Sequence, residues 1–221
     1  MATLPYIQQR FHPRLKIGYT ALVEIGKKTV PVHCRQGEID GACGTYSAAS
    51  ALTILGKISD PARLADRRSG VAARLWSAAR KVYFDGIGVK SLADLLVSLD
   101  AGLRIEVSAR SHTGVLEFTQ SELDAGRLVL LAWRTRRYTQ RHWVLVVGVE
   151  GVQVDDAFAA QTYLCLDPGS YHPQLCGYNG RLEFSQRIPG HSSKFVRYFT
   201  ADAGGSLSVS FSGAVSIGTI D

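Results

Sequence analysis

Small and apolar residues recur at helical spacing directly after a turn near residue 40. The apolar positions follow the i, i+3, i+4, i+7 spacing of one helix face and are Ala48, Ala51, Leu52 and Leu55. The preceding residues 40–44 include two glycines and an aspartate, which favour a turn over a continuous helix. We therefore predict a helix that begins near Cys43 and ends near Gly56.

Two apolar runs rich in β-forming residues follow late in the chain, at 143–149 and 162–166, with a polar, acidic stretch between them. We interpret them as neighbouring antiparallel strands. In a hairpin the first residue of one strand faces the last residue of the other, so His142 would come alongside Asp167. The twofold period of a strand places His142 on the same face as Val144.

Capping signals predict three further helical segments. Asp60-Pro61 suits the N-cap and first position of a helix, and Ser91 begins the next one. The pattern Thr119-Gln-Ser-Glu122 is typical of a capping box at the start of a short helix. That helix would end at Gly126 and lead into a strand over 128–133.

Helical patterns dominate the first half of the chain and strand patterns the second half. The last twenty residues alternate weakly, so we expect them to add edge strands or to fray. This segregation argues for an α+β fold, with the Cys43 helix packed against an antiparallel sheet and a cleft between them. We expect one domain over 1–221, with a core at about 30–170 and further strands within 194–217.

The composition is that of a globular protein. The chain has 221 residues, 46% hydrophobic and 20% charged, which suffices for one well-buried domain and argues against disorder. No stretch has the length of a membrane span, and residues 1–14 lack the apolar core of a signal peptide. We expect a cytoplasmic protein, or one exported by a route without a cleavable signal peptide, and no membrane partner.

The four cysteines form no C-x-x-C pair and no regular framework, which fits a reducing compartment. A zinc site built from Cys165, His172 and Cys176 would need irregular ligand spacing and a ligand inside a buried strand. We therefore expect no metal and no cofactor.

A dense basic cluster precedes His142 within a chain of net charge +6. It contains Arg137, Tyr138 and Arg141, and it would overhang a cleft at His142 and favour an acidic peptide or protein substrate. A solvated basic loop explains the same residues. Only one aromatic residue, Tyr138, is interleaved with the charge, so no nucleic-acid partner is expected.

The turn before the first helix gives Cys43 a candidate chemical role. Unpaired N–H groups and the positive end of the helix dipole favour the thiolate over the thiol. A free cysteine is more often a small buried hydrophobe, so Cys43 alone carries little weight. His142 could take the thiol proton, and Asp167 could accept from the other ring nitrogen and orient the imidazole.

Gln36 is a candidate donor to an oxyanion. Attack on an amide carbonyl creates negative charge on oxygen, and donors already aimed at that atom lower the barrier. The Cys43 backbone N–H and the Gln36 side-chain amide would be two such donors. Six residues separate Gln36 from Cys43.

With these motifs the chain resembles papain-like cysteine peptidases, most closely the bacterial branch that includes the bacteriocin-processing, double-glycine leader peptidases. The matching pieces are Val30-Pro-Val32, Gln36, Cys43-Gly44, Gly126-Arg-Leu-Val-Leu-Leu131, His142-Trp-Val-Leu-Val-Val-Gly148 and Cys165-Leu-Asp167-Pro168. The resemblance implies a papain-like fold, with N-terminal helices and the nucleophile helix on a C-terminal antiparallel sheet. The spacing from Gln36 to Cys43 is one residue longer than the family pattern.

The resemblance also implies a role for each matching residue. Cys43 would be the nucleophile, and His142 the general base and then the general acid. Asp167 would orient the imidazole, and Gln36 would donate to the oxyanion. The expected activity is hydrolysis of a peptide or isopeptide bond. An acyltransferase or deamidase would use the same residues, and a non-catalytic peptide-binding module would keep Cys43 merely buried.

Overall fold

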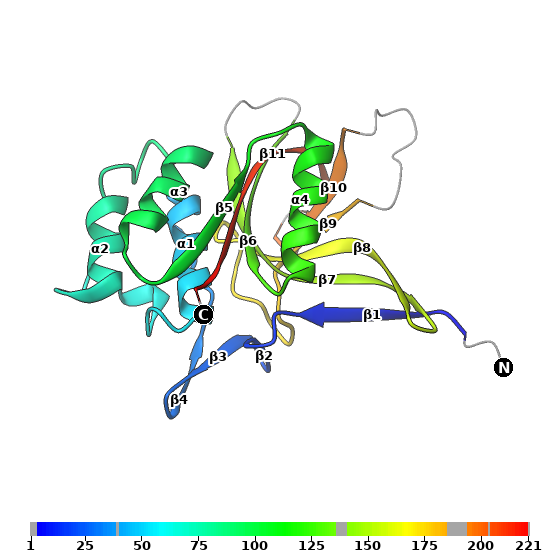
Figure 1. Ribbon diagram of the computed structural model, residues 1–221, viewed down its shortest axis with the longest axis horizontal. Coiled ribbons are helices and arrows are strands. Elements are labelled where there is room, and N and C mark those ends of the chain that lie inside the picture. The colour runs from blue at the N-terminus through cyan, green and yellow to red at the C-terminus, as the bar shows by residue number, and fades with distance from the viewer. Residues whose placement is uncertain (1–3, 39, 136–140, 185–193, 203, 221) are drawn as a thin grey trace.

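The computed structural model describes residues 4–38, 40–135, 141–184, 194–202 and 204–220 (Figure 1). The helices are α1 Cys43–Ile54, the 3-10 turn η1 Pro61–Arg63, α2 Gly70–Ala79, α3 Val89–Ser98 and α4 His112–Asp124. The strands are β1 Tyr6–Phe11, β2 Lys16–Ile17, β3 Ala21–Ile25, β4 Lys28–Pro31, β5 Leu103–Ser108, β6 Leu128–Thr135, β7 His142–Val154, β8 Ala157–Leu166, β9 Gly180–Glu183, β10 Val196–Thr200 and β11 Ser206–Thr219.

Six antiparallel strands close into a barrel in the order β7-β6-β11-β10-β9-β8, and β8 pairs back with β7. Strand β1 extends the sheet outside this ring by pairing with β7, and β5 does so by pairing with β11. Strands β2, β3 and β4 form a separate small sheet. Figure 1 shows β1 and this small sheet below the ring.

Long, bent strands make the closure possible. Strand β7 has 13 residues, and its ladder with β8 is irregular between Val146 and Gly148. Gly148 lets β1 approach closely, because a Cβ there would lie 2.5 Å from the Arg10 carbonyl oxygen. A two-residue turn joins β7 to β8, and Asp155 adopts a φ of 47° in it, a conformation that aspartate tolerates.

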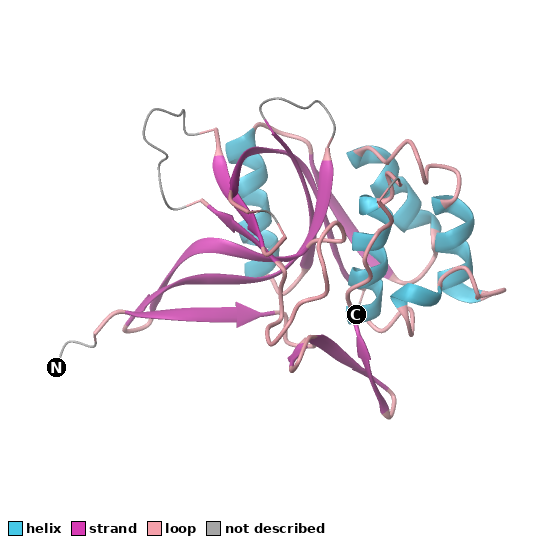
Figure 2. Ribbon diagram, turned by 180° about the vertical axis from the view of Figure 1, so that it is seen from behind, coloured by secondary structure: helices cyan, strands magenta, loops and turns pink. Residues whose placement is uncertain are grey.

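The strand alternation separates two apolar clusters. In β6, Val129, Leu131 and Trp133 belong to a cluster to which all six barrel strands contribute, so this cluster fills the barrel. The intervening residues, such as Leu130, belong to a second cluster shared with α1, α2 and α3. Helices α1, α2 and α3 group on one side of the barrel and α4 lies apart from them, packed on β11 and β6 (Figure 2).

The prediction of a papain-like α+β fold is wrong. The strands close into a six-stranded antiparallel barrel accompanied by four helices, rather than a sheet with a helix laid on it. Helices and strands are not segregated either, since β1 to β4 precede α1. The physical reason is β11, which was expected to be an edge strand or to fray but lies between β6 and β10 and completes the ring.

Several local predictions can be compared with individual elements. Helix α1 begins at Cys43 as predicted, and the expected hairpin is confirmed by the antiparallel pairing of β7 with β8. The capping box at Thr119 is wrong, because α4 begins at His112 with Ser111 as its N-cap. Thr119 instead lies inside the helix and donates to the Val115 carbonyl oxygen at 2.8 Å.

None of the helices in the described part of the chain is long and apolar enough to cross a membrane.

Candidate active site

Cys43 is the first residue of α1 and is 7% exposed. The first N–H groups of a helix have no carbonyl partner within it, so they are available to a ligand at this end. Gly44 allows the helix to approach β7, because a Cβ there would lie 2.6 Å from Ile87 and 3.1 Å from Trp143. Trp143 in turn donates from Nε1 to the Ile87 carbonyl oxygen at 2.9 Å, which ties the 84–88 segment to the barrel.

Asp40 organises the loop before α1. Its Oδ1 accepts from the Ala42 N–H at 3.1 Å, and its Oδ2 accepts from the Gly37 N–H at 2.6 Å. The Tyr83 hydroxyl also donates to Oδ2, at 3.0 Å. One carboxylate therefore fixes both ends of the loop that runs from Gln36 to Cys43.

His142 and Asp167 meet at one end of the barrel. The His142 Nε2 lies 2.6 Å from Asp167 Oδ1, because His142 begins β7 and Asp167 directly follows β8, the strand that pairs with β7. Because Nε2 is bonded to the carboxylate, Nδ1 is the ring nitrogen left to face Cys43. An interaction between the His142 ring and the Cys43 side chain contributes to the charge state of His142.

The Asp167 side chain is almost fully buried and has several donors. Oδ1 also accepts from the Gly169 N–H at 2.7 Å, and Oδ2 accepts from the Tyr198 hydroxyl. Its backbone is held as well, because the Asn179 side chain accepts from the Asp167 N–H at 2.6 Å and donates to its carbonyl oxygen at 2.9 Å. His33 Nε2 contacts that same carbonyl oxygen at 2.8 Å.

These contacts shift the pKa values of the pair in opposite directions. Burial opposes the charged form of His142, but attraction to Asp167, the bond between them and the interaction with Cys43 outweigh burial and raise the pKa of His142. Burial likewise opposes the charge on Asp167, yet its attraction to His142 and the bonds from His142, Tyr198 and Gly169 lower the pKa of the carboxyl. The geometry thus favours an imidazolium beside a carboxylate.

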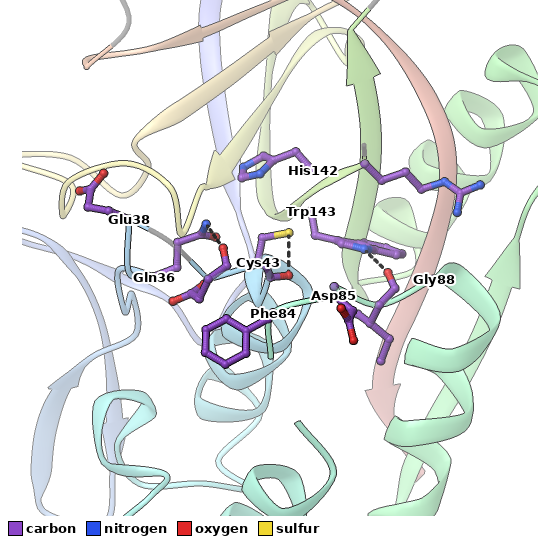
Figure 3. Close-up of a pocket in the computed structure, with 13 residues that line it drawn as sticks. Gln36, Glu38, Cys43, Phe84, Asp85, Gly88, His142 and Trp143 are labelled. Atoms are coloured by element: carbon purple, nitrogen blue, oxygen red, sulfur yellow. Dashed lines mark hydrogen bonds between the residues drawn. The ribbon is translucent and has the colours of Figure 1, made fainter. Parts of the chain in front are cut away.

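A cleft of about 510 Å³ opens at this point between the α1 N-terminus, the 84–88 segment and the start of β7. The lining residues are Gln36, Glu38, Asp40, Gly41, Cys43, Phe84, Asp85, Gly86, Ile87, Gly88, Arg141, His142 and Trp143. Figure 3 shows the Cys43 sulfur and the His142 ring projecting into the same pocket, with Gln36 and Glu38 on one side and Trp143 on the other. A bound acyl group could therefore meet the thiol and the imidazole together.

Gln36 lines the cleft beside Cys43. Its backbone N–H donates to the Pro168 carbonyl oxygen at 2.8 Å, which connects the nucleophile loop to the Asp167 turn. Among the described residues, its side-chain Nε2 makes one contact, a long one of 3.5 Å to the Asp40 carbonyl oxygen, as the dashed line in Figure 3 marks. An amide held this weakly can turn towards a substrate oxygen.

The basic cluster proposed to bind substrate is only partly described. Arg137 and Tyr138 lie outside the described residues. Arg141 lines the cleft, together with the carboxylates of Glu38, Asp40 and Asp85. The described lining therefore carries charge of both signs.

Sequence reasoning missed the residues that support Asp167. Tyr198 and Trp133 lie on β10 and β6, and the Trp133 ring packs 4.8 Å from Tyr198 and 4.9 Å from His142 between centroids. The alternation of Val196 and Tyr198 along the sequence indicates that the Tyr198 side chain is buried, but it does not indicate that Asp167 is its hydrogen-bond partner. His33, which contacts the Asp167 backbone, is also buried, at 3% exposure.

Among the described residues, no three His, Cys, Asp or Glu side chains gather in a way that could hold a metal ion. No model of a known protein family matches the chain, and no curated protein matches its sequence significantly. The likeness to papain-like peptidases remains a prediction from the motifs, and the fold is not that of the family.

Proposed function

We propose that this protein is a cysteine-dependent hydrolase that cleaves a peptide or isopeptide bond through a thioester on Cys43. The observation that carries the proposal is the convergence of Cys43 and His142 in one cleft, with Nε2 of His142 bonded to the buried Asp167 at 2.6 Å. A cysteine that merely filled the core would not need a charged imidazole beside it. The proposal rests on this arrangement of side chains and not on the fold.

The reaction follows from the atoms in the cleft. His142 Nδ1 takes the proton of the Cys43 thiol, and the thiolate attacks the carbonyl carbon, whose oxygen becomes an oxyanion that accepts from the Cys43 N–H and from Gln36 Nε2. His142 then protonates the leaving amine from Nδ1, and the C–N bond breaks to leave a thioester. Next, His142 removes a proton from water, the hydroxide displaces the sulfur, and an acid is released. Asp167 accepts from Nε2 throughout and keeps Nδ1 directed at the reacting atoms.

A peptide-library digestion read by mass spectrometry tests the proposal. We expect the protein to cleave a subset of peptides and to carry an acyl group on Cys43 when quenched with acid. Cys43→Ala should abolish both. The matched control is Cys34→Ala, because burial raises the pKa of the Cys34 thiol to about 11 and makes it a poor nucleophile.

Two results would contradict the hydrolase proposal. One is cleavage that survives Cys43→Ala. The other is a folded protein that cleaves nothing, forms no acyl adduct and leaves Cys43 unreactive to iodoacetamide, which would favour the peptide-binding module. An acyl adduct that transfers to an added amine faster than to water would instead indicate an acyltransferase.

A further inference from the structure

We infer that Tyr198 is a positioning residue of the candidate active site, which fixes the Asp167 carboxylate so that His142 is held towards Cys43. The inference rests on the proposed function and adds a residue from β10 to it. No sequence motif includes Tyr198, and its strand β10 comes near the end of β8 through the intervening strand β9.

The first observation is that the two carboxylate oxygens of Asp167 accept hydrogen bonds from different donors. Oδ1 accepts from His142 Nε2 at 2.6 Å and from the Gly169 N–H at 2.7 Å. Oδ2 accepts from the Tyr198 hydroxyl. With a donor on each oxygen, the carboxylate cannot rotate about its last bond without breaking a hydrogen bond. The plane of the carboxylate then sets the direction of the His142 ring.

The second observation is that the barrel makes room for this phenol. Tyr198 is 3% exposed, and Gly180 on the neighbouring strand β9 lies against it. A Cβ at Gly180 would be 2.9 Å from the Tyr198 hydroxyl oxygen. The ring of Trp133 packs against both Tyr198 and His142, so the phenol and the imidazole contact the same aromatic side chain.

The third observation is a comparison with a second tyrosine of the same interior cluster. Tyr163 is fully buried, and its hydroxyl donates to the Leu116 carbonyl oxygen at 3.1 Å. A backbone carbonyl is therefore enough to satisfy a buried tyrosine in this barrel. Tyr198 differs because its acceptor is the carboxylate bonded to His142. Tyr163 is consequently the matched control.

Other ionisable groups lie near this network and need to be separated from it. His33 contacts the Asp167 carbonyl oxygen, and burial lowers its pKa to about 4. Cys165 faces Asp167 and Tyr198 from β8, and burial raises the pKa of its thiol well above the ordinary value. The Asp202 carboxylate also influences the charge state of Tyr198, and it accepts from the Tyr171 N–H at 2.9 Å. His33 and Cys165 therefore stay uncharged between pH 5 and 9 (roughly the assay range).

The experiment measures how fast iodoacetamide modifies Cys43 between about pH 5 and 9, read at the Cys43 peptide by mass spectrometry. In the wild-type protein the Asp167 carboxylate stabilises the His142 imidazolium and, through it, the thiolate. Tyr198→Phe frees Oδ2 and lets the carboxylate turn, so the pH of half-maximal rate should rise by about one unit. The rate near pH 6 should fall by up to about tenfold. Tyr163→Phe should leave the profile unchanged.

Thermal unfolding of the same variants separates positioning from packing. Both phenylalanine variants lose one buried hydrogen bond, and Tyr198→Phe should lose more stability than Tyr163→Phe because its acceptor is charged. The inference is overturned if the profiles of Tyr198→Phe and the wild type coincide, or if Tyr163→Phe shifts the profile equally. If Tyr198→Phe does not fold, 3-fluorotyrosine at position 198 decides the matter. Its more acidic hydroxyl donates a stronger hydrogen bond to Asp167 and should shift the pH of half-maximal rate, and an unmoved profile overturns the inference.

His142→Ala distinguishes failure of this inference from failure of the proposed function. If the profile of His142→Ala equals that of the wild type, no thiolate–imidazolium pair exists and the proposed function fails. If His142→Ala changes the profile but Tyr198→Phe does not, the proposed function stands and Tyr198 only fills the barrel.

Discussion

Two buried carboxylates, Asp167 and Glu122, are built from the same kinds of contact but lie in different surroundings. Asp167 has a cationic partner in His142 and a hydroxyl donor in Tyr198. Glu122 has a cationic partner in Arg127, with a 2.8 Å bond from Nη2, and a hydroxyl donor in Ser216. The pKa of each carboxyl is lowered. For Glu122 the main cause is the hydrogen bond from Arg127. For Asp167 burial opposes the lowering, but attraction to His142 and the hydrogen bonds that the carboxylate accepts outweigh burial.

The difference lies in the cation and in what the cation faces. Arg127 keeps its charge at all accessible pH values, and the pair joins α4 to β11 through Ser216. His142 can gain or lose a proton, and it opens onto the cleft that contains Cys43. One array therefore holds the fold together, whereas the other can transfer a proton. Hydrogen-bond geometry around a carboxylate does not reveal its role until the partner and the nearest cavity are known.

The largest expected effect separates the two carboxylates by activity. Asp167→Asn keeps the shape but lets the amide nitrogen face His142, so the imidazole should take the wrong tautomer. Turnover of a cleaved peptide should fall by about two to four orders of magnitude. Glu122→Gln should retain most of the activity. Equal losses in the two variants, measured as kcat/KM on folded protein, would break the comparison.

The next effect concerns Gln36, which shares the cleft with His142. Gln36→Ala removes the side-chain donor to the oxyanion and should lower kcat by about 10²- to 10³-fold, or about 3–4 kcal/mol. Its side chain makes one long hydrogen bond to the part of the chain that the structure describes, so the unfolding midpoint should hardly change. Steady-state kinetics together with thermal unfolding check both parts. Unchanged kcat would remove Gln36 from the site.

Substitution of Glu122, which should hardly affect activity, should lower the stability of the fold. Glu122→Gln weakens a buried ion pair and leaves Arg127 without its countercharge, which should cost about 2–3 kcal/mol. Denaturant unfolding measures this loss. The matched control is Asp66→Asn, which weakens an exposed pair with Arg63 and should leave the free energy of unfolding nearly unchanged. A loss at Asp66 as large as that at Glu122 would mean that burial does not distinguish these pairs.

The smallest effect is the pH dependence of stability at Glu122. Its pKa in the folded state is lowered below the ordinary value of 4.5, so its contribution is present above that pH and is lost as the pH falls through the folded value. Glu122→Gln should therefore flatten the decline of the unfolding midpoint between about pH 5 and 3. An identical decline in wild type and variant would assign the acid sensitivity to other groups.

The same two carboxylates indicate how far the sequence could predict the molecule. His142 and Asp167 lie at the open end of one hairpin, so the antiparallel pairing of two apolar runs was enough to predict that they meet, although both strands are longer than those runs. The prediction that His142 meets Asp167 needed no knowledge of the fold. It is therefore correct even though the predicted papain-like architecture is wrong. Helix α1 was predictable for the same reason, because its apolar face and its first residue are local features.

What could not be predicted depends on long-range pairing. Tyr198 reaches Asp167 only because β10 lies between β9 and β11, and the weak alternation of β11 did not indicate that this strand completes a barrel. Thr119 and Glu122 show a related failure. Their three-residue spacing fits a capping box, but the same spacing also places residues on one face of a helix interior. Ser111, eight residues earlier, was the N-cap.

The most direct test of the account is an NMR titration of the His142 ring nitrogens in the wild-type protein and in Cys43→Ala. The account predicts that the His142 imidazole stays protonated well above its ordinary pKa of 6.5, and that Cys43→Ala lowers the midpoint because the negative sulfur is gone. A midpoint at or below 6.5 that does not respond to Cys43→Ala would contradict the pairing of Cys43 with His142.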